Sequence, residues 1–182
     1  MLLIRPSISK DASSLAFLSL EVWSATYLRW GIHAFFADYA LKKFSKPSFE
    51  AALCDPLEIF LVAERNKLLQ GYIRLRLNSD CGLEDTGVAE IRTLYVRPPH
   101  HNRGIGKALL RAGLATLEAG VHGRPWLAVN AQNKEAIGFY TTQGFERVGK
   151  RNFCIEDTRF LNYILSYAVS PTDACQKAMQ DG

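Results

Sequence analysis

The chain has 182 residues, of which 48% are hydrophobic, enough for one substantial core and marginal for two, so we expect a single domain. Its formal charge of +4 comes from 22 Lys and Arg against 18 Asp and Glu, too small an excess for the clustered basic face of a nucleic-acid-binding protein. No apolar run reaches the about 20 residues that cross a bilayer, and the N-terminus lacks the order of a secretory signal. We therefore expect a soluble, cytoplasmic protein with neither nucleic acid nor membrane as a partner.

The cysteine and histidine positions give no metal or redox signature. Cys54, Cys81, Cys154 and Cys175 are scattered without a CxxC pair, and the adjacent pair at 100–101 has no third ligand at metal spacing. We expect free thiols in a reducing compartment and no bound metal.

Periodicity and turn residues predict a mixed α/β (α+β) fold, in which a sheet carries helices on its faces. One domain is expected over residues 1–169, with a loosely held tail at 170–182. The expected strands are Leu2–Arg5, Ile59–Glu64, Leu69–Leu77, Val88–Val96, Trp126–Val129, Phe145–Val148 and Arg159–Val169. The expected helices start at Ser9 or Asp11 and run to Tyr27, and then cover Ala34–Phe44, a turn from Pro47, Gly104–Ala119 and Asn133–Gln143.

The most informative segment is a glycine-bearing turn between a strand and a helix, His101-Asn102-Arg103-Gly104-Ile105-Gly106-Lys107. The first turn of a helix has unpaired N–H groups and a partial positive charge, and glycines let the backbone approach an oxygen closely. The segment therefore predicts a phosphate cradle, with the side chains of Arg103 and Lys107 facing the phosphates, although Lys107 could equally be a solvated helix residue. A strand-to-helix turn without a ligand is the structural alternative.

Two other phosphate motifs fail on spacing. A Walker A loop would need glycine at His101 and Ser or Thr at Ala108, and a dinucleotide fingerprint would need glycine at Leu109.

Instead, the hexapeptide resembles the Arg/Gln-x-x-Gly-x-Gly/Ala pyrophosphate motif of the GNAT superfamily of N-acetyltransferases. It departs at the first position, where His101 stands in place of Arg or Gln. That position mainly shapes the loop, so we expect binding to be kept. A second block, Trp126 to Phe145, is similar to the family's strand-Asn-x-x-Ala-x-x-x-Tyr-x-x-x-Gly-Phe block and follows at the right distance.

The resemblance covers about residues 1–168 and is greatest to PaiA-type spermidine/spermine acetyltransferases, on the segments 21–27, 90–96 and 153–161. It implies a mostly antiparallel sheet in which two central strands splay around acetyl-CoA, the acyl donor. Leu94, Tyr95 and Val96 would offer backbone groups to the pantetheine arm, and a backbone N–H near Tyr95 would polarise the thioester carbonyl. A bulge in this strand would open the slot.

Four further residues border this site. Asn130 and Asn133 would flank the arm, or be ordinary turn and helix-cap asparagines. Tyr140 would lie beside the sulfur and protonate the departing thiolate, the alternative being a core aromatic. Glu90 is the candidate base that accepts the amine's proton, the alternative being an ion pair with Arg92 on the same strand face.

For the acceptor, the resemblance implies that the first two helices wall its pocket, with Tyr27 lining it. In the loop before Glu90, the carboxylates of Glu84 and Asp85 are fallback candidates for binding a cationic substrate. We expect acetyl transfer to a primary amine of a small molecule or peptide by direct attack in a ternary complex, because no cysteine nucleophile lies in either motif block. A non-catalytic acyl-CoA-binding regulatory module and a donor with a longer acyl chain are the alternatives. The chain would be a monomer or a homodimer.

Overall fold

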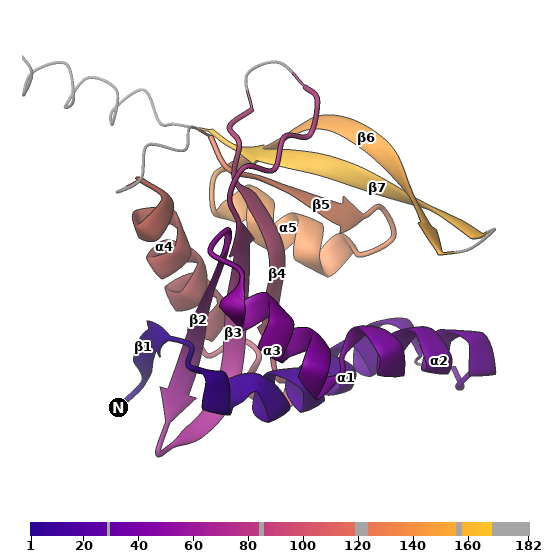
Figure 1. Ribbon diagram of the computed structural model, residues 1–182. Coiled ribbons are helices and arrows are strands. Elements are labelled where there is room, and N and C mark those ends of the chain that lie inside the picture. Colours follow the sequence, from indigo (N-terminus) through magenta and orange to yellow (C-terminus); the bar gives the residue numbers. More distant parts are fainter. Residues whose placement is uncertain (29, 84–85, 119–123, 156–157, 169–182) are drawn as a thin grey trace, which may run out of the picture.

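The computed structural model describes residues 1–28, 30–83, 86–118, 124–155 and 158–168. These residues form a seven-stranded sheet with helices on both faces (Figure 1). The sheet with flanking helices confirms the fold expected from the sequence. The elements in chain order are β1 (Leu3–Pro6), η1 (Ser9–Asp11), α1 (Ala12–Tyr27), α2 (Ala34–Lys43), α3 (Lys46–Cys54), β2 (Glu58–Arg65), β3 (Leu68–Arg76), β4 (Glu90–Val96), η2 (Pro98–His100), α4 (Ile105–Glu118), β5 (Trp126–Asn130), α5 (Lys134–Thr142), β6 (Phe145–Ile155) and β7 (Thr158–Tyr167).

The strand order is β1-β2-β3-β4-β5-β7-β6, and among the described strands only β4 and β5 pair in parallel. A parallel pair needs a crossover connection, and α4 supplies it between these two strands. The sheet therefore consists of an N-terminal antiparallel half, β1 to β4, and a C-terminal antiparallel half, β5 to β7. The junction between the halves lies at β4 and β5.

Two apolar cores lie on opposite faces of this sheet. On one face, Ile73 and Leu75 of β3 belong to a cluster with α4 residues such as Leu109. On the other face, Tyr72 belongs to a cluster with α1 and α3, which includes Leu15. Successive residues of a strand point to opposite faces, so the neighbours Tyr72 and Ile73 of β3 contribute to different cores.

Most element boundaries agree with the sequence-based expectations, and three differ. The turn expected from Pro47 is a nine-residue helix, α3. β4 begins at Glu90 and not at Val88, whose side chain is exposed. β6 continues to Ile155, well beyond the expected end at Val148, because the register shifts between Arg147 and Gly149 and the pairing with β7 then resumes. A bulge of this kind interrupts the alternation on which the sequence-based boundary depended.

No helix in the described ranges is long and apolar enough to cross a membrane. The expected tail at 170–182 lies outside the described residues.

Candidate functional site

The turn between β4 and α4 has the backbone conformation that a tight anion-binding loop requires. Asn102 and Gly104 have positive φ angles of 58° and 76°, the left-handed region that asparagine and glycine tolerate best. The carbonyl of Gly104 accepts the first helical hydrogen bond, from Ala108 N at 3.0 Å, so Gly104 occupies the N-cap position of α4.

The backbone N–H groups of this turn have no partner within the described chain. From Asn102 to Lys107, no N–H donates a hydrogen bond to another described residue. The side chains of Arg103 and Lys107 are exposed, and neither forms an ion pair with a described acidic residue. Free amides and cations at a helix N-terminus are what an anionic group requires, so these residues fit the predicted diphosphate.

His101 stabilises the turn from within. Its Nε2 atom lies 2.8 Å from the carbonyl oxygen of Val96, the last residue of β4, so the imidazole bridges the start and the middle of the loop. This contact is consistent with the loop-shaping role expected for the first motif position. The neighbouring His100 has a lowered pKa, because burial and then the positive charge of Arg103 disfavour its protonated form.

A slot opens next to this turn because β4 leaves β5. Arg74 pairs with Thr93 and Leu75 pairs with Ile91, so Arg92 is an extra residue in β4, a bulge. The parallel pairing of β4 with β5 is limited to Glu90 and Trp126. This matches the bulge and the splayed strands that the sequence predicted.

The edge of β4 that faces the slot offers backbone groups without strand partners. Arg97 N donates to Gln70 O of β3 at 2.9 Å. Since backbone groups alternate in direction along a strand, those of Tyr95 also point to β3, and those of Leu94 and Val96 point to the slot. Alternation therefore directs the backbone N–H of Leu94, and not that of Tyr95, toward the slot.

Tyr140 of α5 is buried near the same edge. Its ring packs against Phe139 and Phe145, with centroids at 5.2 and 5.5 Å. Its hydroxyl makes no hydrogen bond with any described residue, and burial raises its pKa above the ordinary value. The pKa of Tyr95 is raised by burial and also by its phenol neighbours, Tyr140 among them, which places Tyr140 close to β4. The phenol is thus both part of the core and free to donate a hydrogen bond.

The two asparagines have local structural roles. Asn133 is the N-cap of α5, and its Oδ1 accepts a hydrogen bond from Ala136 N at 3.1 Å. Asn130 Oδ1 accepts from Gln132 N at 2.8 Å. These bonds fix the turn between β5 and α5, as the alternative interpretation of both residues required.

Glu90 pairs with Arg92, as the alternative interpretation of this residue expected. Its Oε2 atom accepts hydrogen bonds from Ser79 Oγ at 2.9 Å and from Arg92 Nε at 3.2 Å. Its Oε1 atom lies 3.7 Å from Arg151 NH2 on β6. Glu90 therefore connects the bulge of β4 to the C-terminal half of the sheet.

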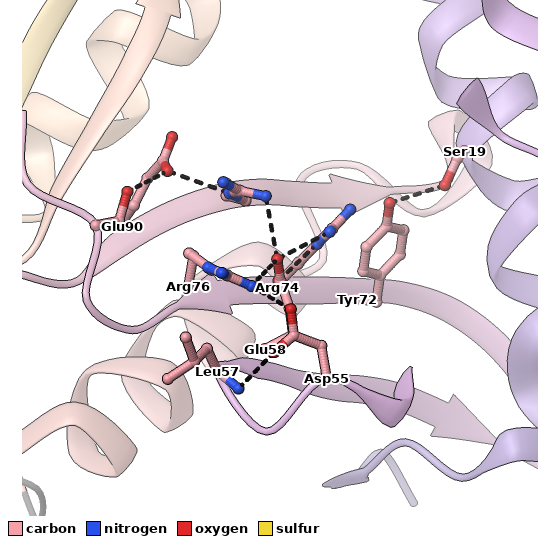
Figure 2. A network of polar contacts seen from close by, with 10 residues as sticks. Ser19, Asp55, Leu57, Glu58, Tyr72, Arg74, Arg76 and Glu90 are labelled. Atoms are coloured by element: carbon pink, nitrogen blue, oxygen red, sulfur yellow. Dashed lines mark hydrogen bonds and ion pairs between the residues drawn. The ribbon is translucent and has the colours of Figure 1, made fainter. Parts of the chain in front are cut away.

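A polar network that the sequence analysis missed surrounds this pair (Figure 2). The side chain of Glu58 on β2 is only 2% exposed, and its carboxylate binds the guanidinium groups of Arg74, Arg76 and Arg92. Arg76 also pairs with Asp55. The sequence did contain a sign of this network. Arg74 and Arg76 follow Tyr72 at alternate positions of β3, and two arginines on one face do not fit a wholly apolar core strand.

Aromatic side chains of α1 and α2 form a wall beside this network. Trp23 packs on Tyr27 and on Tyr39, with ring centroids at 5.3 and 5.9 Å, and Tyr27 itself is half-exposed. Phe36 of α2 reaches Phe160 of β7 at 6.3 Å, so α2 and the β6–β7 hairpin face each other. Tyr27 thus lies on this wall, whereas Glu84 lies outside the described residues.

Among the described residues, no group of three or more His, Cys, Asp and Glu side chains could hold a metal ion.

Comparison with known proteins places these features in a family context. Residues 21–145 match the Acetyltransferase (GNAT) family. A Mycobacterium tuberculosis protein described as an uncharacterized N-acetyltransferase is 32% identical over 117 residues, which are 64% of this chain and 71% of that protein. The N-alpha-acetyltransferase RimI of the same organism is 33% identical over 104 residues, 57% of this chain and 62% of RimI.

The fold has solved counterparts as well. The crystal structure of PaiA N-acetyltransferase from Thermoplasma acidophilum in complex with coenzyme A matches with a TM-score of 0.73 and 22% sequence identity. The match covers 92% of this chain and 99% of that one, so nearly the whole described fold is shared.

Proposed function

The chain belongs to the GNAT acetyltransferase family, and from this premise we propose that it transfers an acetyl group from acetyl-CoA to a primary amine, by direct attack in a ternary complex. The observation that carries the proposal is the row of unbonded amides from Asn102 to Lys107, next to the opened edge of β4. A diphosphate bound there would place the pantetheine arm along the slot. A relative crystallised with coenzyme A supports this donor.

The residues of the slot fit the donor in chemistry and in arrangement. The free amides and the exposed Arg103 and Lys107 would hold the diphosphate. Leu94 and Val96 would hydrogen-bond the arm as a neighbouring strand does, and the Leu94 N–H would polarise the thioester carbonyl. Asn130 and Asn133 would border the arm from the other side, in addition to their capping roles. When bound, acetyl-CoA supplies the thioester that the amine attacks.

Two side chains would manage the protons. With an ordinary phenol pKa of 10.0 that burial raises further, Tyr140 is protonated across the physiological pH range. Its hydroxyl would donate a hydrogen bond to the departing sulfur and then the proton. Glu90 would accept the proton of the attacking amine through a water molecule, since its own oxygens are held by Ser79 and Arg92. Tyr27 would line the acceptor pocket, and Glu84 remains a candidate for binding the acceptor.

The test is release of free thiol from acetyl-CoA in the presence of a panel of primary amines. We expect Tyr140→Phe to lower kcat by about 10- to 100-fold and to leave acetyl-CoA binding within about threefold, the range of one positioned acid–base group. Tyr167→Phe is the matched control, because Tyr167 packs on Phe145 away from the slot. An unchanged kcat in Tyr140→Phe would exclude it as the acid. If none of the amines in a broad panel supported thiol release, a non-catalytic acyl-CoA-binding module would be favoured.

A further inference from the structure

A group of guanidinium side chains lies on the face of the sheet that the aromatic wall borders. It comprises Arg74 and Arg76 of β3, Arg92 at the bulge of β4 and Arg151 of β6. Three carboxylates lie among them: Asp55, Glu58 and Glu90. Four positive charges therefore meet three negative charges beside the point where β4 and β5 separate.

Two of the three acids, Glu58 and Glu90, lie beneath Arg92 and Arg151, whereas the side chain of Asp55 is itself 36% exposed. The side chains of Glu58 and Glu90 are 2% and 13% exposed, whereas those of Arg92 and Arg151 are 39% and 42% exposed. The buried carboxylates hold the guanidinium groups in place from below. What a molecule approaching from solvent meets is therefore cationic, with N–H donors still free.

Arg151 has the least engaged side chain of the four. It makes no hydrogen bond with a described residue, its contact with Glu90 is a distant 3.7 Å, and its guanidinium lies 4.9 Å from the ring centroid of Trp126. An arginine stacked on an indole is held in a fixed orientation while its N–H groups stay available.

Strand register places Arg151 on the acceptor side. Arg151 and Phe153 are two residues apart on β6, so both side chains lie on the same face of the hairpin. Phe153 lies 5.7 Å from Lys43 Nζ of α2, and its strand partner Phe160 contacts Phe36 of α2. Arg151 therefore faces the space between the β6–β7 hairpin and the first two helices.

We propose that the acceptor amine carries a carboxylate, which Arg151 and Arg92 bind in front of the slot. The inference rests on the proposed acetyl transfer and specifies its substrate class. Arg92 is the bulge residue and lies two positions before Leu94. A carboxylate bound by Arg92 would therefore lie close to an amine of the same molecule that attacks a thioester held at the Leu94 N–H. Glu90, between the two guanidinium groups, would face the amine end of the same molecule. A polyamine would instead bring like charges against this surface.

The experiment compares matched pairs of acceptors that differ only in the acid group. Amino acids and their carboxamides are assayed by thiol release, with spermidine as a cationic reference. The carboxylate of an amino acid raises the pKa of its amino group above that of the carboxamide. At neutral pH, a larger fraction of the carboxamide therefore carries the reactive, unprotonated amino group. We expect the acid member of a pair to have the higher kcat/KM by about tenfold or more despite this handicap.

The variant that tests the site is Arg151→Met, which keeps most of the aliphatic stem and removes the charge. We expect kcat/KM to fall about tenfold or more for the acid and to stay within about twofold for its amide. Arg111→Met, on the exposed face of α4, is the matched control and should change neither value. Arg151→Lys keeps a charge and should recover part of the loss, which separates a binding role from a folding defect.

Binding of coenzyme A, measured by calorimetry, separates this inference from the proposed function. Without coenzyme A binding, both fail. If coenzyme A binds but amides or spermidine are the better acceptors, or if no acidic amine reacts, the acceptor inference is wrong and the donor site stands. The acceptor inference is also wrong if Arg151→Met lowers kcat/KM equally for an amino acid and for its carboxamide.

Discussion

The cradle depends on the backbone conformation of one glycine. Gly104 has a φ of 76°, and a Cβ placed on it would meet no atom within 4 Å. Glycine is needed there for its conformation, because other residues pay about 1–2 kcal/mol in the left-handed region. Gly106 differs, since it is helical and a Cβ would make ordinary contacts with Phe139 and Val96, at 3.6 Å and 3.8 Å.

This difference predicts opposite outcomes for two alanine substitutions. Gly104→Ala should lower the free energy of unfolding by about 1 kcal/mol and weaken coenzyme A binding by about tenfold, because the turn must relax away from the conformation that aligns its amides. Gly106→Ala should leave binding within about threefold and be neutral or slightly stabilising, since alanine favours a helix. Calorimetric titration and thermal unfolding measure both effects. Equal binding losses in the two variants would contradict the conformational argument.

At the scale of single residues, the sequence could predict only features that depend on residues close together in the chain. The cradle glycines and the asparagine caps follow from positions near each other in the chain. The partners of Glu90 do not, because Ser79 and Arg151 reach it from distant segments, and Glu58 reaches Arg92 across two strand pairings. Such pairs depend on strand register, which an isolated sequence leaves open.

Among the elements, β3 is built for close approach to both of its neighbours. A Cβ on Gly71 would lie 2.6 Å from the carbonyl oxygen of Tyr95, so only glycine lets β4 pass this point. On the helix side, a Cβ on Gly113 of α4 would lie 2.8 Å from Ile73. These approaches hold both β4 and α4 close to β3, while the other edge of β4 faces the slot. Gly71 and Gly113 fall within an expected strand and an expected helix, but the sequence could not show which neighbouring atoms each one meets.

The start of α1 is joined to the sheet by a partly buried ion pair. Arg5 of β1 donates to both oxygens of Asp11, at 2.8 and 3.1 Å, and Asp11 also accepts from the backbone N–H of Ile8 at 2.9 Å. The hydrogen bonds from Arg5 lower the pKa of the Asp11 carboxyl below its usual 3.8. The pair thus fixes the angle at which α1 crosses the sheet.

Replacing this acid should lower stability at neutral pH, and the effect should shrink as the pH falls below 3.8. Asp11→Asn should lower the free energy of unfolding by about 1–3 kcal/mol at pH 7, the range for a buried hydrogen-bonded charge. Because the folded-state pKa is depressed, the contribution is complete above pH 3.8 and is lost as the pH falls through the folded-state value. Urea unfolding at pH 7 and at a series of pH values descending from 3.8 follows this loss. Glu50→Gln, in the exposed pair with Lys46, is the control and should cost under about 1 kcal/mol.

Considered as a whole, the molecule is two antiparallel half-sheets joined at one parallel contact. The apolar patterns of the strands predicted its layers, and the motif order predicted where a ligand would enter. The length of β6 and the crossing of α2 toward the β6–β7 hairpin could not be predicted, because a bulge and aromatic contacts between remote segments determine them. A ligand in the junction would contact both halves, since the cradle follows β4 and Tyr140 follows β5.

Coenzyme A should therefore stabilise the whole fold against heat. A ligand at about 100 times its Kd adds about 2.7 kcal/mol to the free energy of unfolding, which for a chain of this length corresponds to a rise in Tm of about 5–10 °C. Desulfo-coenzyme A should give a similar rise, because the diphosphate and the arm, and not the thiol, make the contacts. Differential scanning calorimetry at several ligand concentrations measures the effect, and Gly104→Ala should reduce it. A Tm that does not depend on coenzyme A concentration would show that the free amides of the Asn102–Lys107 turn do not bind it.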